Sequence, residues 1–590
     1  MTLANRYPGV IDAPHRNKSA FRTLLRCRTE QVVFISIPEP PHEFLPHERP
    51  FMPGSPATPA HPMRRRVGYF AIGVLLAVAG GFLNGLLLAN LPQIQGALGL
   101  TPVEGGWLTA AYSMTNICMS LLLIKFRQQF GIQRFTRATL AGFLALNVTQ
   151  LFVHDYTFEL VLRAASGIVA SGLSTLALFY IMQALPAAKR LGGFVLGVGF
   201  GQIATPLARV VSPFLLGQGD IENLFIFELG LTLACLGSVA LLRLPPSERV
   251  DAFEPLDFLT FALFAPGMAL LCAVLAQGRI IWWSTPWLGC ALAGATILIS
   301  AALLIERNRA NPLLNTRWIG SRDVLRFAAV AAAMRILLSE QSFGVLGLFT
   351  VVGMSNDQLV GYYALLTAAS VAGLVISIVL LNPLDLIRPV IFATALIVVG
   401  ALIDAHANNL TRPENLYFSQ ALIAFAAIYF LGPTMMVGLV RALAKGPSHI
   451  ISFSAVFSIS QTLGGLGGAA FLGSFQILRE KFHSNALSQS LVLSDPLVAT
   501  RVQQLGGAYA RALGDPVQRQ TQGINLLGQQ VAREANILAF NDVFLLIAAL
   551  AVFVFVWLTA RWGWHKYRGI NPLAGDLAAL QKMMAQRQAQ

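Results

Sequence analysis

The sequence predicts an all-α membrane protein with about fourteen bilayer-spanning helices. Of its 590 residues, 55% are hydrophobic and 12% are charged, whereas soluble domains carry about 25% charged residues. Apolar runs of about 20 residues, long enough to cross a membrane, recur along the whole chain. The net charge of +14 is therefore interpreted as a signal of topology, and no nucleic-acid partner is expected.

Fourteen apolar segments are expected to cross the membrane, each bounded by charges, Pro or Asn. In chain order they cover residues 67–91, 105–124, 136–153, 157–183, 191–216, 222–242, 257–277, 285–305, 326–352, 358–381, 389–403, 416–440, 450–477 and 539–560. The twelfth segment contains Gly432 and Pro433. A kink is expected there, because proline cannot donate a backbone hydrogen bond.

Basic residues indicate how the segments are oriented. Alternate short connections carry Lys125, Arg127, Arg134, Arg137, Lys189, Arg190, Arg243, Arg249, Arg307, Arg309, Arg317, Arg322, Arg388, Arg441 and Lys445. The other connections carry almost none, with Arg279 and Arg412 as exceptions. Short cytoplasmic loops are enriched in Lys and Arg, so these connections and both termini are expected in the cytoplasm.

Two stretches lie outside this pattern. Residues 1–62 are rich in proline without a helical period, which predicts a disordered tail; translation from Met63 is the alternative. Residues 479–537 form an extramembrane insert on the non-cytoplasmic side. Its apolar residues recur at helical spacing, and this amphipathic pair of helices either caps the bundle or docks a partner protein. They are Leu497, Val498, Val502, Leu505, Tyr509, Leu513, Ile524, Leu526, Leu527 and Val531.

The cysteines predict no special chemistry. Four lie in apolar runs and Cys27 lies in the tail, without CxxC or Cys/His spacing. Free thiols are expected, with no metal and no other cofactor.

Five charged residues lie well inside the expected spans: Arg163, Arg209, Glu228, Arg335 and Glu340. A charge at membrane depth costs at least about 2.5–3.5 kcal/mol on insertion scales. Arg335 and Glu340 are five residues apart, so they do not form the favoured i,i+4 pair. One interpretation is a set of buried ion pairs that fix packing. The functional interpretation is that Glu340 loads and releases a proton while Arg335 tunes it or holds an anionic substrate.

Glycines are dense in the fifth span, which contains GVGFG, and in the thirteenth, which contains SQTLGGLGGAAFLGS. A nucleotide loop is excluded, because no strand precedes GVGFG and no GK[ST] follows. Small residues at four-residue spacing favour close helix packing, either static or at interfaces that slide and rock.

Several stretches of the sequence match the motifs of a known protein family. LVLRAASGIVASGLSTLALFYIMQALPAAKR places Gly167 four residues after Arg163 and ends in a Pro186-x-x-Lys189-Arg190 turn. NLPQIQGALGL with GWLTAAYSM, ERNRANPLLNTRWIGSRDVLR, and QILREKFHSNAL with AFNDVFLL are further matches. In these the chain resembles the major facilitator superfamily, and within it the fourteen-span drug:proton antiporters of the EmrB type, over nearly all of residues 64–568.

The chain departs from that family's pattern at three places. The fifth-span signature keeps Gly192, Gly201 and Pro206 but has Thr205, Arg209 and Val210 where glycines are expected. The loop IKFRQQFG keeps Gly131, with Gln128 and Gln129 in place of the family's Asp and Arg. The first span has Leu83, beside Asn84, where the family carries Asp. The usual coupling acid is thus missing, and Glu340 and Glu228 are the expected replacements.

The resemblance implies a major facilitator fold with two six-helix bundles, residues 63–243 and 323–568. Two extra helices and a cytoplasmic linker at 244–322 separate them, and residues 569–590 form a cytoplasmic tail. Substrate binding or coupling is expected at Arg335, Arg163, Arg209, Asn84, Gln202 and Gln461. Packing or conformational roles are expected at Gly167, Gly192, Gly201, Pro206, Gly464, Gly468 and Gly131.

The implied function is secondary transport, namely proton-coupled efflux of amphipathic compounds across a bacterial inner membrane. Three arginines against two glutamates at membrane depth favour acidic or neutral substrates. The expected partners are the substrate, protons, the lipid membrane, a periplasmic adaptor (a membrane fusion protein) and an outer-membrane channel. The alternative is a non-transporting receptor or regulatory scaffold on a transporter fold. No enzyme activity is expected, because no catalytic set lies at membrane depth.

Overall fold

The computed structural model describes residues 54–588, apart from gaps at 153–154, 187–189, 191, 217–220, 310, 383–384, 447–448, 570 and 572. Within these residues the regular structure is entirely helical, and one isolated β-bridge pairs Pro56 with Ser247. The predicted tail up to residue 53, with Cys27, and Lys189 of the Pro-x-x-Lys turn lie outside the described residues.

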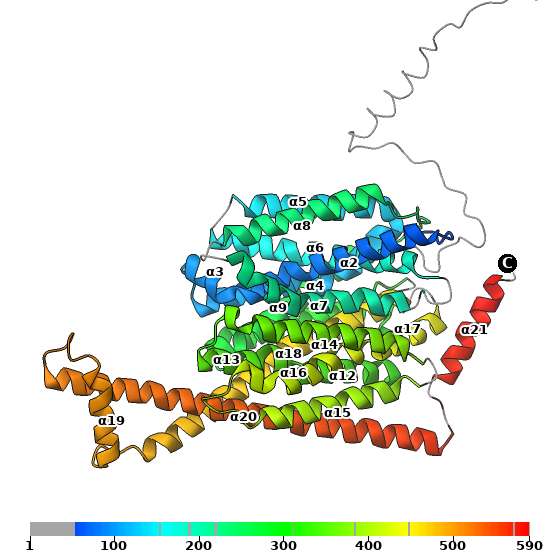
Figure 1. Cartoon of the computed structure of the whole chain (residues 1–590). Helices are drawn as coiled ribbons and strands as arrows, with labels where there is room; N and C mark the ends of the chain where they lie inside the picture. The colour runs from blue at the N-terminus through cyan, green and yellow to red at the C-terminus, as the bar shows by residue number, and fades with distance from the viewer. Residues whose placement is uncertain are drawn as a thin grey trace, which may run out of the picture. The chain divides into compact units, whose positions relative to one another are not determined.

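Seven helices form the N-terminal half of the bundle (Figure 1). They are α2 (Met63–Ala89), α3 (Leu91–Ala97), α4 (Pro102–Phe130), α5 (Ile132–Gln150), α6 (Tyr156–Ala184), α7 (Gly192–Leu216) and α8 (Glu222–Leu241). Helix α2 packs on α6 and α7. A Cβ atom at Gly81 would lie 2.4 Å from the Cβ of Ala204, and one at Gly73 would lie 2.5 Å from the Ile181 side chain. Small residues thus bring these helices into close contact.

Two extra helices follow, α9 (Pro255–Ile281) and α10 (Pro286–Arg307), with the short α11 (Thr316–Ile319). A buried ionic cluster ties them to α4. Lys125 Nζ lies 2.5 Å from Asp257 Oδ2, and Arg309 bonds Asp257, Glu306 and Glu254 at 2.8, 2.6 and 2.7 Å. The prediction that Lys125 and Arg127 lie in a connection was wrong, since both are buried inside α4.

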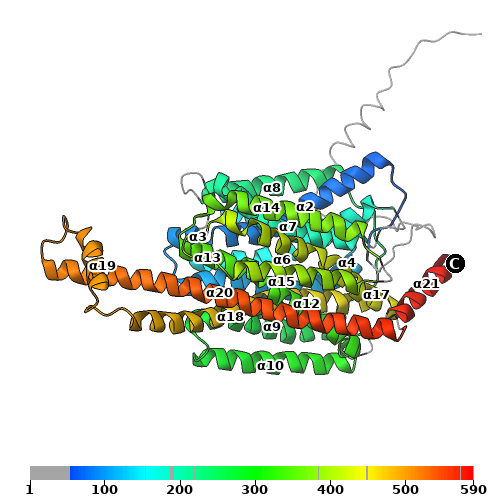
Figure 2. The ribbon, with the colours of Figure 1, turned by 60° about the horizontal axis from the view of Figure 1, so that its bottom comes forward.

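The C-terminal half contains the remaining helices (Figure 2). They are α12 (Arg322–Leu337), η3 (Glu340–Val345), α13 (Leu346–Val352), η4 (Asn356–Leu359), α14 (Val360–Val379), α15 (Ile387–Asp404), η5 (Pro413–Leu416), α16 (Tyr417–Tyr429), α17 (Leu431–Lys445), α18 (His449–Gln489), α19 (Pro496–Gly507), α20 (Pro516–Tyr567) and α21 (Ala574–Gln588). Thirteen helical segments of the described chain are long and apolar enough to span a membrane. Helix α5, which packs against α6 and α8, adds a fourteenth to the bundle, and the predicted all-helical fold is confirmed.

The helix is interrupted near the predicted place, because α16 ends at Tyr429 and α17 begins at Leu431. Pro433 cannot donate to the carbonyl of Tyr429, four residues earlier. The Ser377 hydroxyl of α14 donates to that carbonyl instead, at 3.1 Å. Gly432 allows this approach, since a Cβ there would lie 2.4 Å from Ser377 Oγ.

The insert is built from overlong helices. Helix α18 has 41 residues and α20 has 52, whereas about 20 residues cross a bilayer. Both helices continue beyond the bundle, where α19 packs on α20, and we call this projection (residues 479–537) the arm (Figure 1). At its base Arg479 and His483 of α18 each bond Asp542 of α20 at 2.6 Å.

Residues 54–62 were predicted to belong to a disordered tail, and this was wrong. Residues 54–57 are buried against the N-terminal half. The backbone of Ala57 donates to Pro246 O and accepts from Gln183 Nε2, both at 2.8 Å. These backbone hydrogen bonds give the segment a fixed path that its proline-rich composition does not reveal.

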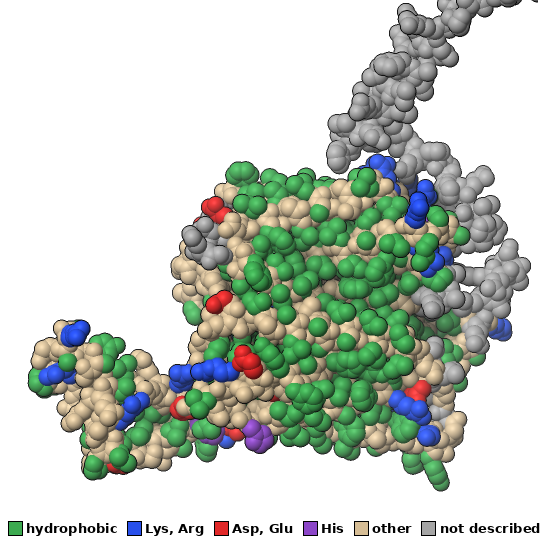
Figure 3. Space-filling view, viewed as in Figure 1, with side chains coloured by type: hydrophobic (Ala, Val, Ile, Leu, Met, Phe, Trp, Pro, Cys, Tyr) green, Lys and Arg blue, Asp and Glu red, His purple; other side chains and the backbone are tan. Residues whose placement is uncertain are grey.

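The two halves meet where α7 packs on α14 and α17, and where α4 packs on α18. Val195 and Ile203 of α7 are buried against Leu374 of α14 and Ile428 of α16. On the face drawn in Figure 3, hydrophobic side chains spread over the bundle between its two ends, where most of the charged side chains lie, as expected for a surface in contact with lipid.

Candidate functional site

The ninth predicted span is not one continuous helix. Helix α12 ends at Leu337, and Glu340 begins η3, a short π-helical stretch. A π-helical turn changes the direction of the side chains around it, and such turns are frequent at functional sites. Gly468 of α18 packs at this point, where a Cβ would lie 2.2 Å from Ser339 Oγ. The break therefore sits in a tight contact between α18 and Ser339, and Glu340 beside it has no exposed surface.

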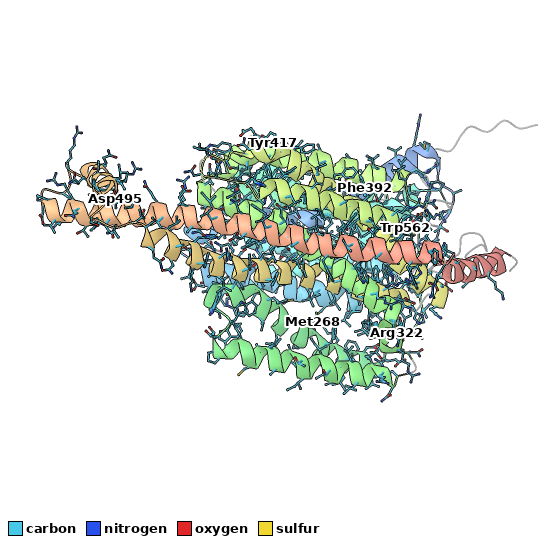
Figure 4. All side chains as sticks on the ribbon, turned by 90° about the horizontal axis from the view of Figure 1, so that it is seen from below. Met268, Arg322, Phe392, Tyr417, Asp495 and Trp562 are labelled. Atoms are coloured by element: carbon cyan, nitrogen blue, oxygen red, sulfur yellow. The ribbon has the colours of Figure 1, made fainter. Side chains whose placement is uncertain are left out.

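Two buried carboxyl groups converge on one amide. Gln420 Nε2 of α16 lies 2.9 and 3.1 Å from the two oxygens of Glu340, and 2.7 Å from Asp404 Oδ2 of α15. All three side chains are fully buried. Figure 4 labels Tyr417 and Phe392 on the two helices that supply Gln420 and Asp404. We call Glu340, Gln420 and Asp404 the acid pair site.

A second layer of hydrogen bonds holds this site in place. The Tyr362 hydroxyl of α14 donates to Gln420 Oε1 at 2.9 Å, and Gln341 Nε2 donates to the Gln420 backbone carbonyl at 3.1 Å. The Ser419 hydroxyl donates to Asp404 Oδ1. Among the described residues neither carboxylate forms a salt bridge, so two negative charges face each other without a cation unless a proton lies between them.

The acid pair site is linked to the interface between the halves. Tyr363, next to Tyr362 on α14, lies under the guanidinium of Arg209 from α7, with 5.2 Å between Cζ and the ring centroid. Arg209 Nη2 also donates to the Leu88 carbonyl of α2 at 3.1 Å. Because Pro213 cannot donate, the Arg209 carbonyl lacks its usual helical partner as well. Arg209 therefore connects the two halves beside the carboxyl pair.

Arg163 occupies a different cluster, in the N-terminal half. Its guanidinium bonds Glu159, one turn earlier on α6, at 2.6 Å, and the Leu83 carbonyl at 3.3 Å. Glu228 of α8 is buried and interacts electrostatically with both charges. Glu159 is thus the carboxylate partner of Arg163, beside Leu83 of α2.

Arg335 lies deep in the bundle, yet its side chain keeps some accessible surface. It packs over two glycines of α18, since a Cβ at Gly464 would lie 2.9 Å from its Cβ and one at Gly465 would lie 3.3 Å from its Nε. No described carboxylate forms a salt bridge with it. Arg335 and Glu340 thus do not pair, in agreement with their spacing.

The other expected polar residues do not join the acid pair site. Asn84 of α2, Gln202 of α7 and Gln461 of α18 are each partly exposed. Gln461 Nε2 is buried without a hydrogen-bond partner among the described residues. Pro206 leaves the backbone carbonyl of Gln202 without its helical partner.

The glycines differ in what they do. A Cβ at Gly167 would lie 2.2 Å from Thr115 Oγ1 of α4, and Gly131 has a φ of 82° where α4 turns into α5. At Gly192 and Gly201 a Cβ would meet no atom within 4 Å. The backbone carbonyl of Gly201 nevertheless packs on α2, because a Cβ at Gly81 would lie 2.8 Å from it. The conformational role expected of Gly192 and Gly201 stays a prediction.

Sequence reasoning missed Asp404, Gln420 and Glu159. Glu159 and Gln420 lie inside the predicted spans, and Asp404 lies one residue beyond a predicted end. Polar residues within or next to apolar runs were the available signal. Glu159 and Asp404 are buried like Glu228 and Glu340, so the count of three arginines against two glutamates left out two buried carboxyl groups.

The family of this chain follows from its similarity to known proteins. The family model described as Major Facilitator Superfamily matches residues 71–471, more than half of the chain. The chain belongs to the major facilitator superfamily. Members of this superfamily are membrane transporters of small molecules, and the thirteen candidate spans among the described residues fit a multi-pass membrane protein.

One curated relative is a major facilitator superfamily multidrug transporter, mfsC, of Aspergillus fumigatus. It is 25% identical over 233 residues, which cover 39% of this chain and 44% of that protein. The chain therefore aligns with less than half of that relative's length.

Two solved structures share the fold. The human organic anion transporter MFSD10 has a TM-score of 0.50 at 16% identity, over 83% of this chain and 100% of that chain. PepTSo2, solved as a tetramer, has a TM-score of 0.50 at 14% identity, over 85% and 99%. These likenesses support the major facilitator fold alone.

Proposed function

We propose that this transporter is proton-coupled and that the acid pair site carries the proton. The observation that carries the proposal is the sharing of Gln420 Nε2 by Glu340 and Asp404. Two acceptors on one nitrogen lie within about 5 Å of each other, and two full charges at that distance repel by about 3 kcal/mol at an effective dielectric of 20. One bound proton relieves this repulsion, and its release restores it.

The same geometry supports a route from protonation to movement. Gln420 joins the carboxyl pair to Tyr362, and the neighbouring Tyr363 contacts Arg209 of the other half. When the pair gains or loses a proton, the hydrogen bonding of Gln420 changes and the contact between α14 and α7 is weakened or strengthened. Alternating access requires such a contact to form in one state and break in the other.

We assign the second candidate acid, Glu228, to a different role. It lies beside the Arg163–Glu159 pair and shares no amide with another carboxyl. The cluster fixes α2, α6 and α8 against one another. The proton site is therefore placed in the C-terminal half, and Glu228 remains a residue for comparison.

The substrates we propose are amphipathic and neutral or acidic. Arg335 supports this, because it is deep, partly accessible and has no described carboxylate partner. The multidrug transporter among the relatives supports a broad substrate range. Arg335→Gln should lower transport of the weak acid fluorescein by about tenfold relative to ethidium, whereas Arg388→Gln, an exposed arginine paired with Asp385, should change neither.

We further propose an EmrB-like exporter of a bacterial inner membrane, with both termini in the cytoplasm. The arm supports a partner on the opposite side, because Leu497 is 80% exposed and Val517 69%. A periplasmic adaptor that leads to an outer-membrane channel would cover such side chains. Removing the arm should preserve folding and proteoliposome transport but lower export from intact cells; unchanged export would contradict the docking role.

Substrate-dependent proton flux in proteoliposomes tests the proposed function as a whole. A pH-sensitive dye inside the vesicles should report proton movement when fluorescein, ethidium or a neutral amphipathic drug is added. Absence of flux with every probe would favour the receptor or scaffold alternative. That alternative has support in the α4–α5 turn, where Gln128 and Gln129 bond the 244–253 linker at 2.9 and 3.0 Å.

A further inference from the structure

An apolar pocket opens at the end of the C-terminal half where α12 begins and where α17 and α20 end. Helices α12, α15, α17 and α20 line it, together with Leu573 just before α21. Its wall is almost entirely apolar and includes Phe327, Val437 and Leu558. All of its lining residues come from the C-terminal half. None of them belongs to α7 or α14, the helices that carry the Arg209–Tyr363 contact between the halves.

Three arginines from three different helices surround this pocket: Arg326, Arg441 and Arg561. Arg441 Nη1 donates to the backbone carbonyl of Asp323 at 2.8 Å, and Arg326 Nη1 lies 3.7 Å from the Asp323 carboxylate, with both of these side chains exposed. Arg561 Cζ lies 5.6 Å from the Trp557 ring centroid. A guanidinium has five N–H donors, so donors remain for a ligand.

The acidic neighbours do not balance this charge. Asp323 faces Arg326, Arg441 and Arg561, and Asp576 of α21 faces Arg441 and Lys445. Four cations therefore stand against two carboxylates among the described residues here. Nearby positive charge from Arg441 and Lys445 acts to lower the pKa of Asp576, but burial outweighs it and raises the pKa of that carboxyl above its ordinary value. The pocket mouth thus favours an anion.

Aromatic residues indicate the depth of the pocket in the membrane. Trp557, Trp564 and Tyr567 of α20 are exposed, and Trp and Tyr collect at the level of lipid headgroups. Figure 4 labels Trp562 and Arg322 at this same end of the bundle. The arginines therefore lie at headgroup level, while Phe327, Val437 and Leu558 lie on the hydrocarbon side.

We propose that this pocket binds an anionic phospholipid of the surrounding membrane. The phosphate would accept charge-assisted hydrogen bonds from Arg441 and Arg561, and one acyl chain would pack on the apolar wall between α15 and α20. Basic pockets between spanning helices suit this class of ligand. The proposal does not depend on proton coupling or on the direction of transport.

Lipid-dependent unfolding of the purified full chain tests this. In a neutral detergent, phosphatidylglycerol should raise the unfolding temperature in a saturable way, and phosphatidylcholine should have much less effect. Each arginine near the surface adds about fivefold in affinity, so Arg561→Gln should weaken phosphatidylglycerol binding about fivefold and the double variant with Arg441→Gln about 25-fold. Arg134→Gln, which changes an exposed arginine on α5 of the N-terminal half, is the matched control and should bind normally.

Other outcomes would overturn the proposal. Equal stabilisation by phosphatidylcholine would remove the charge argument, and equal stabilisation by inorganic phosphate would show a free anion site without an acyl chain. If the double variant does not fold, Arg561→Gln and Val437→Trp, which fills the apolar wall, must each weaken binding. Unchanged phosphatidylglycerol binding in both variants would exclude this pocket.

Discussion

Replacing Glu340 by Gln removes the proposed proton carrier while keeping its shape. The new carbonyl oxygen can accept from Gln420 Nε2, now 2.9 Å from the carboxylate, and the new amide nitrogen can donate to Asp404. The loss of folding free energy should therefore stay below about 1 kcal/mol. Glu340→Ala would instead leave a buried donor of Gln420 without this acceptor, at a cost of about 1–3 kcal/mol.

Transport should respond far more than stability does. One pH unit is worth about 1.36 kcal/mol per proton, so a gradient of two units can drive about a hundredfold accumulation if one proton moves per substrate molecule. Proteoliposomes with the wild-type protein should approach this accumulation ratio, and proteoliposomes with Glu340→Gln should accumulate substrate only about onefold, which means no accumulation. Exchange of labelled for unlabelled substrate without a gradient should continue in the variant, because exchange needs no net proton movement.

The comparison with Glu228→Gln makes this test decisive. Glu228 is also a buried carboxyl at membrane depth, but it lies in the Arg163–Glu159 cluster, so its variant should keep gradient-driven accumulation. Full accumulation by Glu340→Gln would refute the role of the acid pair site. Loss in Glu228→Gln alone would move the proton site to the N-terminal half.

Three further changes test the packing described above. Gly432→Ala should lower the free energy of unfolding by about 1–3 kcal/mol, because its Cβ would lie 2.4 Å from Ser377 Oγ. Gly467→Ala is the control and should leave it unchanged, because a Cβ there meets no atom within 4 Å. Unfolding temperatures measured in detergent compare the two variants. Lys125→Met should lower the free energy of unfolding by about 3–5 kcal/mol, because buried Asp257 then keeps Arg309 but loses Lys125 as a partner. An unchanged unfolding temperature would contradict this. Hydrogen bonds from its arginine and asparagine partners hold the pKa of Glu254 below its ordinary value of 4.5, so their stabilisation exists above that pH and is lost on acidification. The difference in unfolding temperature between wild type and Glu254→Gln should therefore shrink as the pH falls below 4.5 and vanish only below the lowered pKa of Glu254.

The positions of the helices were predictable because the bilayer sets their length. Each predicted span overlaps a helix, and the break before Pro433 followed from the missing backbone donor. The break at Glu340 was not predictable in this way. Nothing in AAMRILLSEQSFG interrupts an α-helix, and the close contact of Ser339 at this turn is with Gly468 of a helix distant in the sequence.

The chemistry was predictable only in part, for a related reason. Glu340 stands out because it lies in the middle of an apolar run. Asp404 lies at the end of α15, where a charged residue is ordinary, so its burial depends on packing by η5 and α16. Gln420 draws attention only once both carboxyl groups are seen to meet on its nitrogen. A single sequence gives the members of such a site but not their convergence.

Continuous helices in the arm have a mechanical consequence. Helix α18 runs without a break from the contacts at Gly464 and Gly468 to its end at Gln489. At about 1.5 Å per residue, roughly 30 Å of stiff rod separates Gly468 from that end. A rotation of about 10° at the glycine contact would sweep the far end through about 5 Å, so the tip amplifies small rearrangements beside Glu340 into a displacement that a bound protein can sense.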